Sequence, residues 1–180
     1  LHRVDRRQRQ MCIRDSSLAR AESAAARMTS MVTDLLDFAR MGGARPRITT
    51  VDVGEIVDEV LEDLDGAVVG AGAEVVVDAS AFVRADDTLL RVLLQNLIAN
   101  AVKFTVAAGR VPRVFVNVQE LPDGWRLTVD DNGDTVDPAV RDRMFEPMQR
   151  GHDGEVPGLG IGLATCRRIA QAHGGHIGLE

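Results

Sequence analysis

The sequence predicts an α/β protein in which one long helix precedes a domain of strands and helices. Two patterns predict this class. Apolar residues repeat at alternating spacings of three and four between residues 17 and 41, which is typical of a long helix with a partner. After residue 47, apolar segments of strand length alternate with segments of helical period. A chain of 180 residues is long enough for one domain of ordinary size and an appendage.

The composition limits the functions that the chain can have. Hydrophobic residues make up 45% of the sequence, which is enough for a core, but the aromatic residues are one Trp and five Phe with no Tyr. So few rings, together with a net charge of −6, argue against nucleic acid as a partner. No apolar run has the roughly 18 residues that a membrane span needs. We therefore expect a soluble chain without a membrane segment. We also expect a cytoplasmic location, with a membrane anchor elsewhere in the parent protein left open.

The first residues differ in composition from the rest. Residues 6–16, RRQRQMCIRDS, are basic and aperiodic. We interpret residues 1–16 as a non-native or disordered arm and exclude them from the fold. A native basic arm is the alternative interpretation.

The helix predicted for residues 17–41 has an apolar seam three heptads long. Three further apolar residues widen this face and favour a bundle of helices over a two-stranded seam. A glycine pair ends the helix, and Pro46 prevents it from resuming. We therefore expect a linker at residues 42–47 and a domain at residues 48–180. The seam residues are Leu18, Ala21, Ala25, Met28, Val32, Leu35 and Ala39, and the widening residues are Met31, Leu36 and Phe38.

The domain begins with short strand and helix patterns in alternation. Small residues between Gly66 and Gly72 predict a turn. Asp86 or Asp87 is expected to cap the helix after the third strand, because a carboxylate can accept a hydrogen bond from a free N–H group of the first turn. The expected elements are strands at residues 48–53, 74–77 and 82–84, and helices at residues 53–64 and 89–105.

The second half of the domain begins with a β-hairpin. Residues 111–118 and 125–129 are predicted strands, and Pro-Asp-Gly at residues 122–124 supplies the residues that a turn requires. A long polar connection follows, and connections of this length usually have a function. The remaining expected elements are a helical piece near residues 139–144, a helix at residues 159–173 that ends at a glycine pair, and a strand at residues 176–180.

The helix expected at residues 89–105 combines an apolar face with a narrow polar stripe. At roughly 100° per residue, Asn96, Asn100 and Lys103 lie within about 60° of one another. Asn is a poor helix former, and a stripe needed only for solubility would more readily contain Glu, Lys or Gln. Two carboxamides and a cation together therefore suggest a polar ligand, although caps for a neighbouring loop are an equal alternative for this helix alone. The opposite face contains Leu93, Leu94, Leu97, Ile98, Ala101 and Phe104.

A glycine-rich segment precedes the last helix. The alternating glycines Gly158, Gly160 and Gly162 let backbone N–H groups come close to an anion, and a helix N-terminus after them favours phosphate. The spacing differs from a GxxxxGK[ST] loop and from the GxGxxG of a dinucleotide fold, so another kind of phosphate loop is expected. A glycine-rich hinge is the alternative.

An acidic turn, Asp130-Asp131-Asn132-Gly133, closes the second hairpin strand. A carboxylate at a strand end can accept a hydrogen bond from an exocyclic amine, which adenine has and guanine replaces by a carbonyl. Alone, this sequence is an ordinary turn. Its place between the asparagine stripe and the glycine segment favours a nucleotide site.

These motifs together resemble the ATP-binding domain of the family of gyrase, Hsp90, histidine kinases and MutL, and specifically that of sensor histidine kinases. QNLIANAVKFT resembles their N box, VDDNG their G1 box, MFEP their F box and GLGIGLA their G2 box. The seam helix ending in LLDFAR is similar to the second helix of their dimerisation hairpin, and the last helix is similar to that of phytochrome-type sensors. The resemblance implies a two-layer α/β sandwich with helices on one face of a mixed sheet.

The resemblance also implies a site for Mg-ATP. Asn100 would provide an oxygen to Mg²⁺, and Asn96 would support the same metal and phosphate cluster. Lys103 and Arg150 would neutralise the triphosphate, so that Asn96, Lys103 and Arg150 have the catalytic roles. Family members that hydrolyse ATP have a glutamate at position 96 as general base, so Asn96 favours phosphoryl transfer.

The remaining site residues follow from the same resemblance. Asp131 would bind the adenine amine, and Gly133 would allow a close backbone approach. Phe145 would anchor a mobile ATP lid between itself and the glycine segment. The phosphates would lie against Gly158, Gly160 and Gly162, with Leu163 beside them.

The implied activity is transfer of the γ-phosphoryl group of ATP to a histidine. The intact protein would be a homodimer through the helix at residues 17–41 and would pass the phosphoryl group to a response regulator. No histidine lies in the expected acceptor context, so we expect this chain alone not to phosphorylate itself. His173 is interpreted as interacting with the dipole of the last helix. An ATP-hydrolysing member of the same fold family and a degenerate, non-catalytic docking module are the alternatives.

The G1-like turn departs from the family pattern at two positions. Thr135 replaces a second glycine, and Asp134 adds negative charge nearby. If this position requires a positive φ, Thr costs on the order of 1 kcal/mol or more and weakens nucleotide binding. The sequence is also expected to be truncated at both ends, so that the final strands of the domain are missing.

Overall fold

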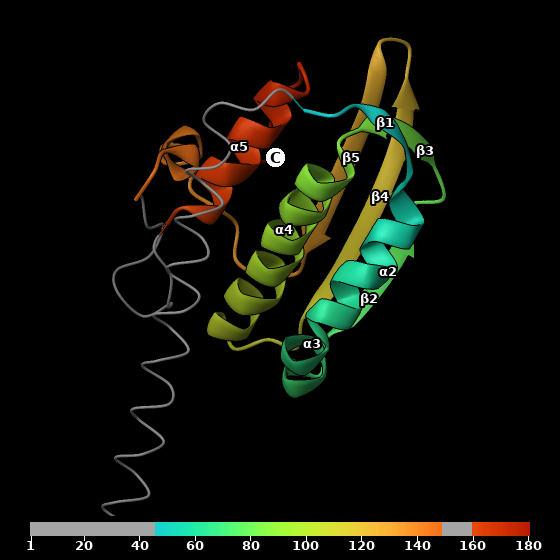
Figure 1. Cartoon of the computed structure of the whole chain (residues 1–180). Coiled ribbons are helices and arrows are strands. Elements are labelled where there is room, and N and C mark those ends of the chain that lie inside the picture. The colour runs from blue at the N-terminus through green and yellow to red at the C-terminus, as the bar shows by residue number, and fades with distance from the viewer. Residues whose placement is uncertain (1–45, 149–159) are drawn as a thin grey trace, which may run out of the picture.

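The computed structural model describes residues 46–148 and 160–180, which are coloured in Figure 1. The arm at residues 1–16 and the helix predicted at residues 17–41 lie outside the described residues. The elements are, in chain order, β1 (Thr49–Asp52), α2 (Val53–Asp63), α3 (Asp65–Ala71), β2 (Glu74–Asp78), β3 (Phe82–Ala85), α4 (Asp87–Ala107), β4 (Arg113–Leu121), β5 (Gly124–Asp131), the 3₁₀ helix η1 (Asp142–Phe145) and α5 (Gly162–Ala172).

Three of these strands form a mixed sheet in the order β2-β4-β5. β2 pairs with β4 in parallel, with Val76 opposite Phe115, and β4 pairs with β5 in antiparallel, with Val116 opposite Val129. β1 and β3 form a separate antiparallel pair. The predicted hairpin is confirmed, and both of its strands are longer than predicted. A parallel pair needs a long crossover connection, and α4 lies within the one that joins β2 to β4.

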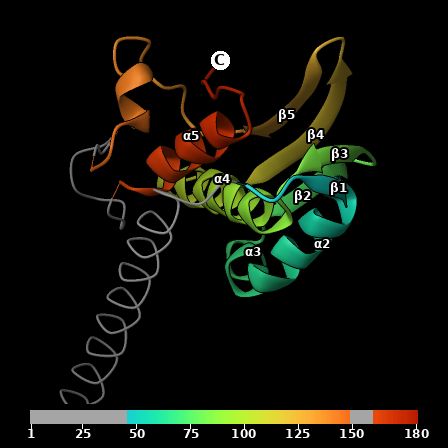
Figure 2. The ribbon, with the colours of Figure 1, turned by 45° about the horizontal axis from the view of Figure 1, so that its top comes forward.

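The helices cover one face of the three-stranded sheet, as Figures 1 and 2 show. Successive residues of β4 point to opposite faces, so Val114 and Val116 are buried beneath the helices whereas Phe115 is exposed on the far side. The predicted arrangement of helices on one face of a mixed sheet is confirmed for the described residues. The helices contribute Val53, Ile56, Val57, Val60, Leu94, Ile98, Ala101 and Val102 to the buried core.

Helix α4 is the central helix of this layer. Its N-cap is Asp86, whose Oδ1 accepts a hydrogen bond from the Leu89 N–H group at 3.1 Å, as predicted. The helix packs against the sheet and against α2, α3 and α5. It is long and apolar enough to pass a test for a membrane span by length and composition alone. The helix packs against the sheet on one side and against other helices, so these contacts account for its apolar face.

A histidine joins the end of α5 to the start of α4. His173 Nε2 accepts a hydrogen bond from the backbone N–H group of Asp86 at 2.9 Å, and His173 Nδ1 lies 2.8 Å from the Ile169 carbonyl oxygen. Nε2 therefore carries no proton, and Nδ1 donates its proton to Ile169. The interpretation of His173 as a partner of the α5 dipole stays a prediction, and the structure adds that the ring joins the last turn of α5 to the start of α4.

Three local predictions differ from the structure. Residues 65–71 form helix α3 instead of a turn, because Val68 and Ala71 pack against the core and Gly72 ends the helix in the left-handed conformation. Helix α5 begins at Gly162, three residues later than predicted, because Gly160 has a φ of 69°. Residues 176–180 are irregular, since none of the described strands pairs with them.

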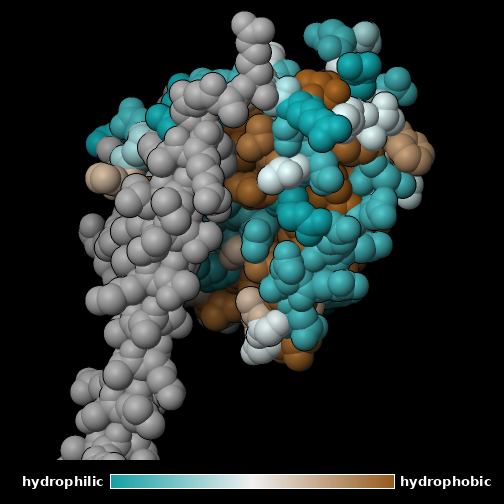
Figure 3. Space-filling model, viewed as in Figure 1, coloured by the Kyte–Doolittle hydropathy of each residue, from teal (hydrophilic) through white to brown (hydrophobic). Residues whose placement is uncertain are grey.

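The outer surface of α2 is charged. Figure 3 shows a mainly hydrophilic surface over this helix, where Glu55, Asp58 and Glu62 are exposed. Arg91 of α4 forms an ion pair with Glu59 of α2. The amphipathic pattern of α2 is therefore explained by one core face and one solvated, acidic face.

Candidate functional site

The polar stripe of α4 begins with an asparagine whose orientation is fixed. The Asn96 Nδ2 group donates a hydrogen bond to the Val92 carbonyl oxygen at 2.8 Å, one turn earlier in α4. Because a carbonyl oxygen can only accept, this contact identifies the nitrogen of the carboxamide. The Asn96 Oδ1 atom therefore points away from its own helix backbone and is available to the site.

The start of α5 lies directly against this stripe. A Cβ atom added to Gly162 would lie 2.5 Å from Asn96 Oδ1 and 3.8 Å from Asn100 Nδ2. Real side chains do not come this close, so a residue without a side chain is needed where α5 meets α4. The structure thus brings Asn96, Asn100 and one of the predicted phosphate-loop glycines together.

The acidic turn after β5 lies farther along the same helix. Asp131 Oδ1 accepts hydrogen bonds from the Gly133 N–H group at 2.7 Å and from the Thr105 hydroxyl at 3.3 Å. A Cβ atom on Gly133 would lie 2.6 Å from Asp131 Oδ1 and 3.2 Å from Thr105 Oγ1. The turn therefore packs against α4 at Thr105, which is fully buried.

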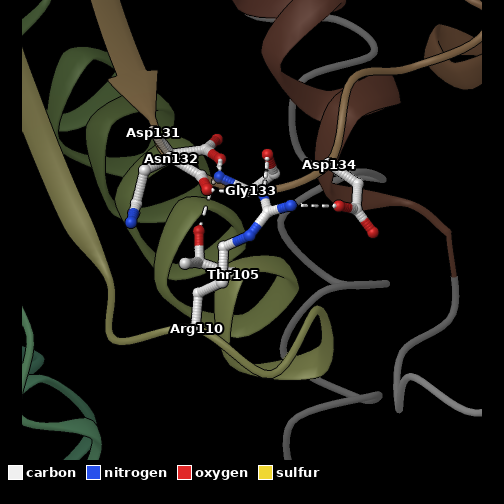
Figure 4. Close-up of polar contacts among 6 residues, drawn as sticks. All are labelled: Thr105, Arg110, Asp131, Asn132, Gly133 and Asp134. Carbon is white, nitrogen blue, oxygen red and sulfur yellow. Dashed lines mark hydrogen bonds and ion pairs between the residues drawn. The ribbon is translucent and has the colours of Figure 1, made fainter.

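Arg110, in the connection between α4 and β4, holds this turn from the outside (Figure 4). Its Nη1 atom donates to the Asn132 and Gly133 carbonyl oxygens at 2.8 and 2.6 Å, and its Nη2 atom lies 3.0 Å from Asp134 Oδ1. Three successive residues of the turn are therefore bound by one guanidinium group. The charge of Asp134, expected to be unfavourable, is paired.

The expected strain at Thr135 is not found. Met148 is the one non-glycine residue at positive φ in the described part of the chain, so Thr135 has a negative φ. Gly133 also has no positive φ, and its close contacts explain the glycine instead. The backbone cost was expected only if this position required a positive φ, and because it does not, the cost does not arise.

The other predicted site residues that the structure describes lie at η1, on α4 and at the start of α5. Phe145, at the end of η1, is buried, and η1 packs against α5. Lys103 lies on α4 with its Nζ atom 4.7 Å from the Phe104 ring centroid. Leu163 is half-buried in the first turn of α5. The Gly160 carbonyl oxygen accepts a hydrogen bond from the Met148 N–H group at 3.0 Å. Arg150 and Gly158 lie outside the described residues.

Two residues that complete the site were not identified from the sequence. Thr105 was part of the quoted N box but received no role, although a threonine on the buried face of a helix needs a partner for its hydroxyl group. Arg110 carries no sequence signal for its contacts, because they are with backbone carbonyl groups more than 20 residues away.

The described site has two ends that α4 connects. Asn96 and Asn100 face Gly162 at one end, and Thr105 contacts Asp131 at the other. Thr105 lies nine positions after Asn96 in the helix, a rise of roughly 14 Å. Neutral amide oxygens suit a hard cation that binds mainly through phosphates, and the carboxylate suits an amine. A mixed sheet is covered by helices, and α4 has groups suited to phosphate at one end and a carboxylate suited to a base at the other. This combination is that of a nucleotide-binding domain.

Comparison with known proteins agrees with this class. The family described as histidine kinase-, DNA gyrase B-, and HSP90-like ATPase matches residues 85–180. The chain belongs to this family, as the ATP-binding catalytic domain of a two-component sensor histidine kinase. It is 36% identical over 154 residues to the phytochrome-like protein Cph1 of Synechocystis, covering 85% of this chain and 20% of that protein.

Other relatives are sensor kinases. The chain is 32% identical over 161 residues to the adaptive-response sensory kinase SasA of Synechococcus, covering 86% of this chain and 42% of that protein. Full-length ShkA, crystallised with AMPPNP, is similar with a TM-score of 0.73 at 30% identity over 91% of this chain and 35% of ShkA. ThkA in complex with the response regulator TrrA shares the fold, with a TM-score of 0.64 at 20% identity over 88% of this chain and 44% of that chain. The chain spans less than half the length of these proteins.

Proposed function

We propose that this domain binds ATP together with Mg²⁺ and supplies the γ-phosphoryl group to a histidine of the intact protein. The observation that carries the proposal is the contact of Gly162 with Asn96 and Asn100, because it places a phosphate-loop glycine against two carboxamides on the polar face of α4. Asp131 at the other end of the helix suits the adenine amine.

Each residue has a defined part in this proposal. The Asn100 amide oxygen would bind Mg²⁺, which neutralises phosphate charge, and Asn96 would orient the same cluster. Lys103 and Arg150 would offset the negative charge of the triphosphate. Asp131 Oδ2 would accept the hydrogen bond of the adenine amine while Oδ1 keeps its two bonds to the protein. Phe145 would hold the base of the lid, and the backbone at Gly158, Gly160, Gly162 and Leu163 would face the phosphates.

The proposed chemistry is positioning and charge stabilisation. The bond between the γ-phosphorus and the bridging oxygen breaks, ADP leaves, and a bond forms to the histidine nitrogen, which loses a proton when that nitrogen carries one. Asn96 favours this transfer over hydrolysis, because an amide cannot remove the proton of an attacking water. The acceptor histidine lies outside this sequence in the proposal.

The proposed partners are those of a two-component system. A second copy would pair through the helix at residues 17–41, and a response regulator would receive the phosphoryl group. The complex of ThkA with TrrA supports this choice of partner, since ThkA has the same fold. A cytoplasmic location would suit both ATP and the regulator.

Melting temperature tests the site. Millimolar Mg-ATP should raise the melting temperature of the chain by several degrees, because a ligand at about 100 times its Kd adds roughly 2.7 kcal/mol to the free energy of unfolding. Asn100→Ala should abolish the part of this shift that depends on Mg²⁺ and leave the part seen with ATP and a chelator.

A matched control is Asn117→Ala. Asn117 lies on the far face of β4, where its Nδ2 atom donates to the Asp78 side chain at 3.3 Å. This variant should keep the full Mg-ATP shift. A wild-type chain whose melting temperature does not respond to Mg-ATP would contradict the proposed function, and a normal Mg²⁺ response in Asn100→Ala would remove Asn100 from its role.

A further inference from the structure

Arg110 binds the backbone of the acidic turn in an unusual way for an exposed arginine. Its guanidinium group bonds to two successive carbonyl groups, at Asn132 and Gly133, and to the carboxylate of the next residue, Asp134. The side chains of Arg110 and Asp134 are 49% and 57% exposed. An arginine fork is suited to such a set, because its donors lie in one rigid plane.

A second contact holds the other side of the same turn. Asn132 Oδ1 accepts a hydrogen bond from the Arg113 backbone N–H group at 2.7 Å, and Asn132 Nδ2 donates to the Val111 carbonyl oxygen at 3.1 Å. The connection at residues 110–113 therefore binds the turn both through the Arg110 side chain and through its own backbone. Figure 4 shows Asn132 next to Asp131 in this turn, with Arg110 beside them.

The position of the turn sets the position of the Asp131 carboxylate. The Gly133 N–H group donates to Asp131 Oδ1 at 2.7 Å, and the carbonyl group of the same glycine accepts from Arg110 at 2.6 Å. A displacement of Gly133 would therefore change its hydrogen bond to the Asp131 carboxylate and its hydrogen bond to Arg110 at the same time. An exposed ion pair such as that of Arg110 with Asp134 contributes little to overall stability, whereas the two hydrogen bonds to carbonyl groups fix the backbone of the turn beside Asp131.

We infer that Arg110 is a positioning residue that holds the turn so that Asp131 meets the amine of adenine, and that it thereby contributes to the selection of adenine over bases with a carbonyl at that place. The inference rests on the proposed function, because it assumes that the nucleotide binds with its base at Asp131. Arg110 itself does not touch the base in this arrangement and acts through Gly133.

Binding of two nucleotides to the full chain tests this role. ATP and ITP differ at the base, where ITP has a carbonyl in place of the amine, so their affinity ratio measures the contact with Asp131. Arg110→Ala should weaken ATP binding by roughly tenfold, the equivalent of one good hydrogen bond, and leave ITP binding within about twofold. Arg126→Ala, which removes an exposed arginine from β5 without a contact to the turn, should change neither affinity.

Two further variants make the result specific. In an Asp131→Asn background, Arg110→Ala should have no further effect on ATP binding, because the contact that it positions is already lost. Arg110→Lys should restore only part of the ATP preference, since a lysine keeps the charge opposite Asp134 but lacks the planar fork. Circular dichroism should show that each variant is folded.

The outcomes separate the two proposals. Equal loss of ATP and ITP binding in Arg110→Ala, or no loss of either, would overturn the positioning role while the proposed function stands. Additive losses in Arg110→Ala and Asp131→Asn would also overturn it. A wild-type chain that binds neither nucleotide would overturn the proposed function and this inference with it.

Discussion

Two glycines of the site are explained by space rather than by backbone conformation. Neither Gly133 nor Gly162 has a positive φ. A Cβ atom added to Gly133 would lie 2.6 Å from Asp131 Oδ1, and one added to Gly162 would lie 2.5 Å from Asn96 Oδ1. Both distances are too short for atoms that are not bonded to each other. At the residue scale, these two contacts are where the turn and the glycine segment approach α4 most closely.

Gly162→Ala should therefore weaken Mg-ATP binding without unfolding the domain. The new methyl group would displace the Asn96 side chain, and overpacking of this kind costs about 1–3 kcal/mol, so affinity should fall by roughly tenfold or more. The melting temperature without nucleotide should also fall, because the higher helix propensity of alanine offsets only part of this cost. Titration calorimetry measures the affinity.

Gly178→Ala is the matched control for this change. An added Cβ atom there meets nothing within 4 Å, so both the affinity and the melting temperature should stay as in the wild type. An unchanged Mg-ATP affinity in Gly162→Ala would show that Asn96 can move without consequence, and would argue against a role for Asn96 in the site.

Residue types in sequence order were enough to predict most of the candidate site, but not the contacts between its parts. Asn96, Asn100 and Asp131 are unusual for their positions on a helix and at a strand end, so they could be chosen directly. The ion pair of Arg110 with Asp134 could not, because it depends on how the connection before β4 meets the turn after β5. For the same reason Asp134 and Thr135 were expected to be unfavourable.

At the element scale, the periodicity of apolar residues predicted the hairpin, α2 and α4 well. It failed at α3, where two glycines in seven residues have a low helix propensity. The helix exists because Val68 and Ala71 pack against the core and because α2 ends immediately before it. Tertiary contacts of this kind are not visible in a local pattern, and neither is the absence of a pairing partner for residues 176–180 among the described strands.

Helix α3 offers a test of this explanation. Gly70 lies inside the helix with open space at its Cβ position, whereas Gly72 follows it with a φ of 61°. Gly70→Ala should raise the free energy of unfolding by about 0.5–1 kcal/mol, because alanine has the higher helix propensity. Gly72→Ala should lower it by about 1 kcal/mol or more, because a side chain is strained at that φ.

Urea denaturation of the two variants measures both effects. Opposite signs at positions two residues apart would confirm a helix that ends in a left-handed cap. Equal changes of either sign would contradict the helical assignment of residues 65–71 and favour the turn that the sequence suggested.

At the scale of the whole molecule, α5 is attached to α4 at several points along its length. Gly162 contacts the asparagine stripe, Cys166 Sγ lies 3.8 Å from the Leu93 carbonyl oxygen, and His173 accepts a hydrogen bond from Asp86. The first of these contacts lies in the candidate site, and the last joins the end of α5 to the cap of α4. Loss of the packing between these helices would therefore reduce both stability and nucleotide binding.

Cys166 makes the stability of this packing sensitive to alkaline pH. The thiol is fully buried between the helices, and burial raises its pKa from the ordinary value of 9.0 to about 12. Between these two values the thiol of the unfolded chain ionises while that of the folded chain keeps its proton. Proton loss then favours the unfolded state, so stability should fall as the pH rises above 9, by up to about 1.4 kcal/mol per pH unit.

The sequence makes this effect unusually easy to isolate, because it has no Tyr and Lys103 is its only lysine. Urea denaturation of the wild type and of Cys166→Ala between pH 8 and pH 10.5 should give stability curves that approach each other above pH 9 and cross before pH 10.5, since the wild type loses roughly 2 kcal/mol over that range. The variant should begin about 1 kcal/mol less stable, since the smaller side chain leaves a cavity, but it should lack the loss of stability that the buried thiol causes. Parallel curves for the two proteins would show that Cys166 ionises equally in the folded and unfolded states, and would contradict its burial between α4 and α5.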